Sequence, residues 1–235
     1  MTGGVAAVVL GARGEAAIAA ALAGLEWAAT RVVLDPSDRL GGIALPPGVR
    51  RVTGDPAAAV AGASWALLVG DDERVTPALA RAIVAATAAG DAAVAIPRAL
   101  AAGSGLLRVA GAAVRLVPAA EAQVRPPVDG TLAWRTRRPV RRLDTPLVVA
   151  EPASLEQAVI ELDGETTALA ALPGMATARV GVGAALLAPA AATLRLLVAR
   201  GARLGWGRWV RAVLAGYRVL VLQAKRWERA QEVAL

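Results

Sequence analysis

Trp-Ala-Leu-Leu-Val-Gly-Asp-Asp-Glu-Arg-Val-Thr-Pro, residues 65–77, is the stretch that decides the fold class of this 235-residue chain. Trp65–Val69 is an uncharged apolar run of strand length, which is typical of a strand buried on both faces. Three acidic residues follow the run almost at once. Thr76-Pro77 then has the pattern of a helix start, because a threonine side chain can cap the first turn and proline is tolerated at the first helical position. The stretch predicts a buried strand, an acidic turn and a helix.

The same alternation of strands and helices continues outward from this stretch. Short apolar runs predict further strands at Val5–Leu10, Arg31–Leu34 and Val94–Ile96. Helical spacing of apolar residues, or a helix-start pattern, predicts helices at Glu15–Leu25, Asp55–Ala63, 76–89 and 154–172. Strands that alternate with helices favour a mostly parallel sheet with right-handed crossovers. The pattern weakens after Pro97, where Leu106–Val109 and Ala113–Val117 predict an antiparallel pair.

The composition excludes several kinds of chemistry. The chain has no Cys, so it has neither disulfides nor Cys-ligated zinc or iron–sulfur sites. It has no His either, which excludes His-based acid–base catalysis and the usual serine triads. Any metal ion must therefore sit on Asp or Glu oxygens, and these ligands favour Mg²⁺ or Mn²⁺.

Charged residues gather where the predicted strands end. The residues that come just after a predicted strand are Arg13, Glu15, Asp35, Asp71, Asp72 and Glu73. Ligands of open α/β sheets bind beyond the carboxyl ends of the strands, so these residues predict a binding site at one sheet edge. The alternative is purely structural, because acidic residues favour helix N-termini and Asp is a common turn residue.

Residues 65–77 resemble the strand–acidic–helix segment of family 2 glycosyltransferases, in the branch related to lipopolysaccharide-core β-glucosyltransferases. Other segments are similar to that family in the same order along nearly the whole chain. They are the turn Ala12-Arg13-Gly14-Glu15, the strand end Val32–Asp35, Pro146-Leu147 with Ser154–Glu156 and Leu162…Thr166-Thr167, and residues 205–228, which end in Lys225-Arg226-Trp227-Glu228.

The resemblance implies a GT-A-like (Rossmann-like), mostly parallel sheet flanked by helices over residues 1–176. It also implies a helical, membrane-proximal C-terminal region over residues 177–235. Asp72, with Asp71 beside it, would hold the Mg²⁺ or Mn²⁺ that neutralises the diphosphate of a nucleotide-sugar donor. Asp35, Asp71 and the turn that contains Arg13 and Glu15 would contact the nucleotide.

The chain departs from the family pattern at several positions. Gly70 stands where the family has the first Asp of its Asp-x-Asp motif, Asp129-Gly130 where it has a His-Glu pair, and Val149 where it has a further His. Asp129 is then the nearest candidate for the catalytic base. Two functions stay open: a transferase that moves a sugar from a nucleotide-sugar donor to a lipid-linked or glycan acceptor, and a catalytically degenerate binding or scaffold protein. Gly70 and Gly130 favour the second.

The basic charge is concentrated at the C-terminus. Residues 1–176 have 16 basic and 17 acidic side chains, whereas residues 177–235 have 10 basic and 2 acidic ones. This excess is local rather than interleaved along the chain, so it favours an anionic membrane surface over nucleic acid. The arginine-rich loop 125–142 fits either a solvated run or contacts with a phosphorylated acceptor or lipid headgroup.

Helical geometry divides Gly205–Arg229 into two sides. One is an apolar stripe of Trp206, Val210, Val213, Tyr217, Leu220, Ala224 and Trp227, and the other contains Arg208, Arg211, Arg218, Lys225, Arg226 and Arg229. The pattern predicts a helix lying in the plane of an anionic membrane, and the alternative is a helix that packs its stripe on the protein. Val5–Leu10 lacks the basic flank of a secretory signal. We therefore expect a cytoplasmic protein, peripheral on the inner face of the plasma membrane.

Overall fold

The structure is a computed structural model of the 235-residue chain. It describes residues 4–90, 92–102, 105–125, 132–150, 152, 154–173, 187, 189–191, 193–194 and 206–232. These residues fall into two compact units, one within Met1–Arg125 and Leu132–Ala153 and the other within Ser154–Leu235. The boundary expected from the sequence is at residue 176, whereas this division groups the helix that begins at Leu155 with the C-terminal helix.

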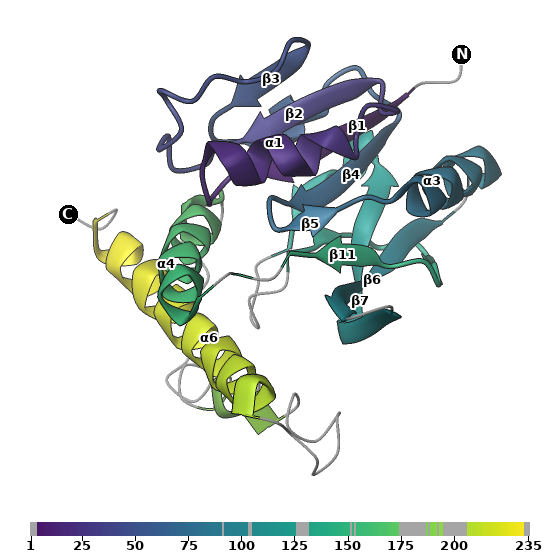
Figure 1. The fold of residues 1–235 in the computed structure, drawn as a ribbon. Coiled ribbons are helices and arrows are strands. Elements are labelled where there is room, and N and C mark those ends of the chain that lie inside the picture. The colour runs from purple at the N-terminus through teal and green to yellow at the C-terminus, as the bar shows by residue number, and fades with distance from the viewer. Residues whose placement is uncertain are drawn as a thin grey trace. The chain divides into compact units, whose positions relative to one another are not determined.

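The first unit is an α/β structure built on a large, curled, mixed sheet (Figure 1). Its strands are β1 (Val5–Leu10), β2 (Thr30–Leu34), β3 (Val49–Val52), β4 (Trp65–Gly70), β5 (Glu73–Arg74), β6 (Ala93–Ala102), β7 (Gly105–Pro118), β10 (Val140–Arg142) and β11 (Leu147–Val149). Their order is β3-β2-β1-β4-β7-β6-β11-β5, and β10 also pairs with β6. A separate pair consists of β8 (Gln123–Val124) and β9 (Trp134–Arg135). The helices are α1 (Glu15–Ala23), α2 (Pro56–Ala59), α3 (Pro77–Ala89) and the short 3₁₀ turn η1 (Ala119–Glu121).

The predicted sheet is confirmed in its first half and corrected in its second. β1, β2 and β4 are parallel neighbours, as expected. The predicted fourth strand, β6, is not adjacent to β4, because the antiparallel β7 lies between them. The predicted pair Leu106–Val109 and Ala113–Val117 is wrong, since both runs belong to the single strand β7. Gly111 does not interrupt that strand, and both runs pair with β6 in one long hairpin.

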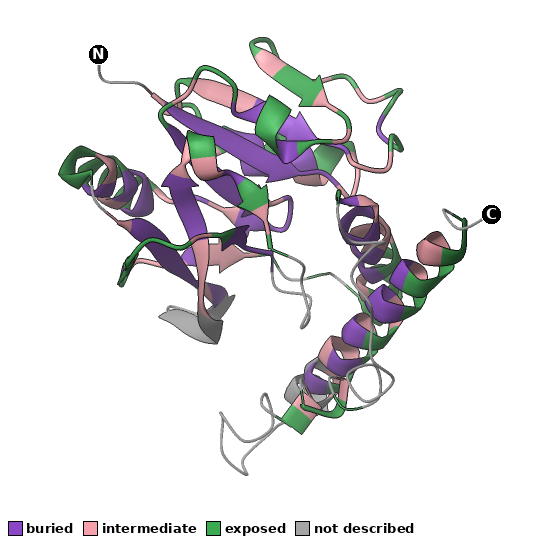
Figure 2. Cartoon of the chain, turned by 180° about the vertical axis from the view of Figure 1, so that it is seen from behind, coloured by how far each residue is buried: buried purple, intermediate pink, exposed green. Residues whose placement is uncertain are grey.

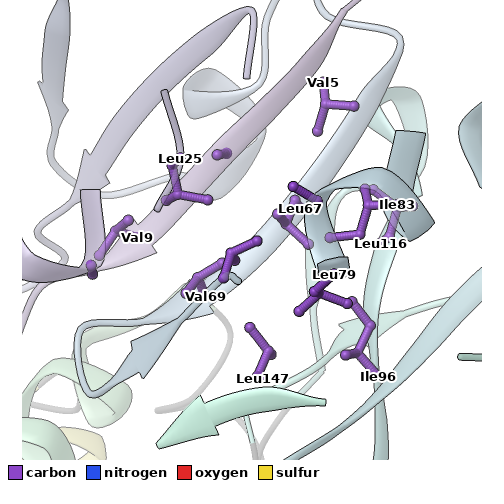
Figure 3. Close-up of a cluster of buried hydrophobic side chains, with 14 of the residues drawn as sticks. Val5, Val9, Leu25, Leu67, Val69, Leu79, Ile83, Ile96, Leu116 and Leu147 are labelled. Carbon is purple, nitrogen blue, oxygen red and sulfur yellow. The ribbon is translucent and has the colours of Figure 1, made fainter. Parts of the chain in front are cut away.

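α1 and α3 contribute to one buried core with the central strands. Their apolar side chains, among them Ile18, Leu22 and Ile83, belong to the same cluster as those of β1, β4, β6, β7 and β11 (Figure 3). Each buried Leu or Ile contributes about 1.5–3 kcal/mol. Every residue of β1 is buried, which is what its uncharged sequence predicts for a central strand (Figure 2).

The start of α3 follows the predicted chemistry, and its end is explained by a glycine. The Thr76 side chain accepts a hydrogen bond from the Leu79 amide, and Pro77 occupies the first turn. The helix ends at Gly90, whose φ of 80° is in the left-handed region that favours glycine. The predicted helix start at 76–77 is therefore confirmed, and it fixes where the segment between β4 and α3 must end.

The second unit contains two long helices that pack on each other, α4 (Leu155–Ala171) and α6 (Trp206–Glu232). The Ser154 side chain caps α4 by accepting from the Gln157 amide, as the sequence indicates. On α6, the buried positions include Ala212, Val219, Leu222 and Arg226. No helix in the described residues is both long enough and apolar enough to cross a bilayer.

The structural alternative, in which the apolar stripe of α6 packs inward, does not describe how α6 packs on α4. Arg218 forms an ion pair with Glu165 of α4, and Lys225 forms one with Asp163 at 2.6 Å. Four large residues of the stripe remain exposed by 40–64%: Val213, Tyr217, Leu220 and Trp227, which we call the α6 stripe. Helical periodicity found the two faces correctly, but the face that packs is the one that carries several of the basic residues.

Candidate functional site

Two loops meet at the carboxyl ends of the parallel strands. The turn of residues 11–14 follows β1, and the acidic segment of residues 71–73 follows β4. β1 and β4 are adjacent, with Leu10 opposite Gly70 in the last pair. The chain continues from β1 to β2 and β3 on one side and places β4 on the other, so this edge is a topological switch point, where open α/β sheets bind their ligands.

Asp71 ties the two loops together. One of its carboxylate oxygens accepts hydrogen bonds from the amides of Ala12 at 2.6 Å and Arg13 at 2.7 Å. The Arg13 guanidinium lies 3.5 Å from the other oxygen. Burial raises the pKa of Asp71 to about 7, although the two amides and Arg13 act in the opposite direction. The acidic segment is thereby fastened to the turn before α1.

Asp72 is paired with two arginines, one from the turn after β1 and one from within β6. Its Oδ2 lies 2.6 Å from Nη2 of Arg98, which comes from β6, and 3.5 Å from Nη2 of Arg13. Asp72 as a whole is only 6% exposed. Charge-assisted hydrogen bonds of this length are among the stronger polar contacts in proteins.

Glu73 is the most deeply held of the three carboxylates. It accepts from the Gly70 amide at 2.7 Å, and it forms ion pairs with Arg98 at 2.7 Å and Arg115 at 2.6 Å. Both Glu73 and Arg115 are 1% exposed. Arg115 lies at a bulge of β7, because Leu116 pairs with Val94 while Val114 already pairs with Ala95. A bulge redirects a side chain, and here it accompanies an inward-turned guanidinium.

Arg74 completes the group. Its Nη1 donates to the carbonyl oxygens of Asp71 at 2.9 Å and Glu73 at 3.0 Å. Burial lowers the pKa of Arg74, against the attraction of Asp72 and Asp71. We call the whole group the sheet-edge cluster: Arg13, Asp71, Asp72, Glu73, Arg74, Arg98 and Arg115. Among the described residues, the cluster contains four guanidinium groups and three carboxyl groups, which is an excess of positive charge.

The structure explains why a glycine occupies position 70, where the family motif has an aspartate. A Cβ atom at Gly70 would lie 2.5 Å from Oδ1 of Asp72, a distance shorter than van der Waals contact. The space that an aspartate side chain would enter is therefore filled by the Asp72 carboxylate. The glycine permits the close approach of Asp72 and Glu73 to the end of β4.

The structure brings together only some of the predicted site residues. Arg13, Asp71 and Asp72 meet in the sheet-edge cluster. Asp35 is fully buried at the end of β2, where its carboxylate accepts from the amides of Arg39 at 3.1 Å and Leu40 at 2.8 Å and so holds the following loop. Glu15 is exposed in the first turn of α1. Asp129 lies outside the described residues.

Sequence reasoning missed Arg74, Arg98 and Arg115. A signal for two of them was present, because Arg98 is the one charged residue in the sequence of β6 and Arg115 stands in the apolar run Ala113–Val117. A charge inside a buried strand needs a partner, and Glu73 after β4 was available. The arginines of the 125–142 loop were considered instead, and of these Arg138 pairs with Glu121 at 2.6 Å on the surface.

The arrangement is a poor fit to a divalent cation. No three carboxylates in the described residues are grouped so that they could hold one. A cation on Asp72 would have to displace the guanidinium of Arg98 and enter a cluster with a positive excess. The assignment of Asp72 and Asp71 as ligands of Mg²⁺ or Mn²⁺ stays a prediction, and it requires these contacts to break.

The comparisons with known proteins add no family assignment. No protein-family model matches the chain. No curated protein matches it either.

Proposed function

We propose that this chain is a glycosyltransferase-like protein with a GT-A-like fold, which binds a nucleotide-sugar donor at the sheet-edge cluster and transfers the sugar to a lipid-linked or glycan acceptor. The observation that carries the proposal is the position of the cluster at the switch point between β1 and β4. The order of the motifs resembling family 2 glycosyltransferases supports it.

The chemistry of the cluster suits the leaving group of such a transfer. A departing nucleoside diphosphate gains negative charge, and fixed positive groups stabilise it without reorganising. The side chains of Arg13 and Arg98 are each 14% exposed, so ligand atoms can approach them. Asp129 remains the candidate base, by its place in the sequence alone.

A second candidate function is binding without catalysis. Each of the three acidic side chains after β4 already accepts hydrogen bonds from, or forms ion pairs with, other residues of the chain. Gly70 also leaves no first aspartate in the motif. These contacts favour a catalytically degenerate protein that binds a glycan intermediate or an active transferase at the membrane.

Ligand binding and turnover distinguish the two. Thermal unfolding with UDP, GDP, CDP and ADP should show stabilisation by at least one of them, because a ligand of the native state raises the melting temperature. The corresponding nucleotide sugar, incubated with membranes, should then release its nucleoside diphosphate if the chain is a transferase. Stabilisation without release supports the binding protein, and no stabilisation by any diphosphate refutes donor binding.

We further propose that the protein is peripheral on the inner face of the plasma membrane and that α6 makes the contact. The exposed α6 stripe supports this, since Trp and Tyr rings settle at the headgroup level of a bilayer. The electrostatic contribution of α6 to membrane binding is smaller than the sequence suggests. Arg218 and Lys225 pair with acids of α4, and Arg226 is 5% exposed.

Vesicle sedimentation tests this contact. We expect binding to vesicles with anionic lipid, weaker binding to neutral ones, and partial retention at high salt because apolar insertion is not screened. Trp227→Ala should reduce binding, whereas Val84→Ala, which truncates an exposed apolar residue of α3, should not. Unchanged binding of Trp227→Ala would reject the α6 stripe as the contact.

A further inference from the structure

The sheet-edge cluster has the charge of an anion site and not of a cation site. In the part of the chain that the structure describes, its guanidinium groups outnumber its carboxyl groups, and they come from four separate places: the β1–α1 turn, β5, β6 and β7. Arginine is suited to phosphate because its planar fork donates two parallel hydrogen bonds. A divalent cation would meet the repulsion of this positive excess before it reached any carboxylate oxygen.

The four arginines differ in what they can reach. Arg115 is buried with Glu73 and serves as an internal anchor. Arg74 is bound to backbone carbonyl oxygens on its own segment. Arg13 and Arg98 remain partly exposed, and both lie against the same oxygen, Oδ2 of Asp72. Asp72 therefore holds the two partly exposed guanidinium groups side by side, as a carboxylate bridging two cations.

We infer that Arg13 and Arg98 take the place of the divalent cation and bind the diphosphate of the ligand directly. Asp72 then acts as a positioning residue, which orients the two guanidinium groups. Gly70 is part of the same arrangement, because a side chain there would push Asp72 away from them. This inference rests on the proposed binding of a nucleoside diphosphate at the cluster, and it specifies how the charge of that ligand is compensated.

The test compares binding with and without divalent cations. The wild-type protein is titrated with UDP, GDP, CDP and ADP by calorimetry and by thermal unfolding, once in EDTA and once in Mn²⁺. We expect equal affinity and equal stabilisation in both conditions, and competition by inorganic pyrophosphate in EDTA. Binding that requires Mn²⁺ overturns the inference and leaves the proposed function standing. No binding of any diphosphate in either condition overturns both.

Variants assign the effect to the two arginines. Arg13→Gln and Arg98→Gln should each weaken diphosphate binding about tenfold or more, since each removes a charged donor. Arg98→Lys should recover part of the affinity, and Arg81→Gln, an exposed arginine of α3, should leave it unchanged. Thermal unfolding without ligand shows whether a variant is folded. If Arg98→Gln does not fold, Arg13→Gln and the competition by pyrophosphate test the inference instead. Undiminished affinity for the diphosphate in a folded Arg13→Gln variant overturns it.

Discussion

The sheet-edge cluster and the α6 stripe are opposite exceptions to the usual distribution of residues. The cluster buries charge: Asp71, Glu73 and Arg115 are at most 2% exposed. The α6 stripe exposes apolar area: Trp227 is 64% exposed. Buried charges are expensive unless they are paired, and exposed apolar stripes are uncommon without a partner surface. The difference teaches that the first region is held by its own contacts, whereas the second contributes little to the fold and is available for binding.

The largest loss of stability is expected when the buried ion pair in the cluster is broken. Glu73→Gln removes the buried carboxylate that lies 2.6 Å from Nη2 of Arg115, so we expect the free energy of unfolding to fall by about 3–5 kcal/mol. Urea unfolding followed by circular dichroism measures it. The matched control is Glu26→Gln, an exposed acid after α1, which should change stability by less than about 0.5 kcal/mol. A comparably small loss for Glu73→Gln would contradict the pairing.

A smaller loss is expected from filling the space beside Asp72. In Gly70→Ala the new Cβ forces Asp72 to move, and such overpacking costs about 1–3 kcal/mol. Gly42→Ala is the control, because a Cβ there meets no atom within 4 Å. The same urea titration compares the two. Equal stability of both variants would show that the end of β4 adapts, and it would remove the structural reason for Gly70.

The pH dependence of stability probes the cluster through Asp71. Burial raises the pKa of Asp71 from 3.8 to about 7, so in this window the folded protein keeps a proton that the unfolded chain releases. The stabilisation is complete below the unfolded pKa and is lost as the pH rises through the folded pKa, by at most about 1.4 kcal/mol per pH unit.

Asp71→Asn should therefore flatten the pH dependence of the free energy of unfolding between about pH 4 and about pH 7, the window between the unfolded and the folded pKa. Asp38→Asn, at an exposed turn position, is the control and should keep the wild-type slope. Parallel slopes in wild type and Asp71→Asn would show that Asp71 titrates alike in the folded and unfolded chain.

Local signals in the sequence predicted local structure well. The run Val5–Leu10 and the cap at Thr76 depend on neighbouring residues alone, and both are confirmed. The place of β7 between β4 and β6 depends on pairings between residues far apart in the sequence, which periodicity does not contain.

The same limit applies to the site. The sequence placed Arg13, Asp71 and Asp72 at one edge because strand ends meet there, and this grouping holds. It did not identify Arg98 and Arg115, whose contacts depend on the hairpin register and a bulge. On α6 the amphipathic pattern was visible, but which face packs is decided by Asp163 and Glu165 on another helix.

The smallest effect is expected in the second unit, and it sharpens the contrast between the two regions. The Lys225–Asp163 pair has nearly the same N–O distance, 2.6 Å, as the Arg115–Glu73 pair. Its surroundings differ, because the Asp163 side chain is 62% exposed and the Lys225 side chain 20%. Water screens such a pair and solvates either partner when the other is removed. Lys225→Gln should therefore lower the free energy of unfolding by no more than about 1 kcal/mol. A salt titration of wild-type stability accompanies this variant, since a screened pair weakens with ionic strength and a buried one scarcely does. If Lys225→Gln costs as much as Glu73→Gln, distance rather than burial governs the strength of these pairs, and the comparison between the two regions fails.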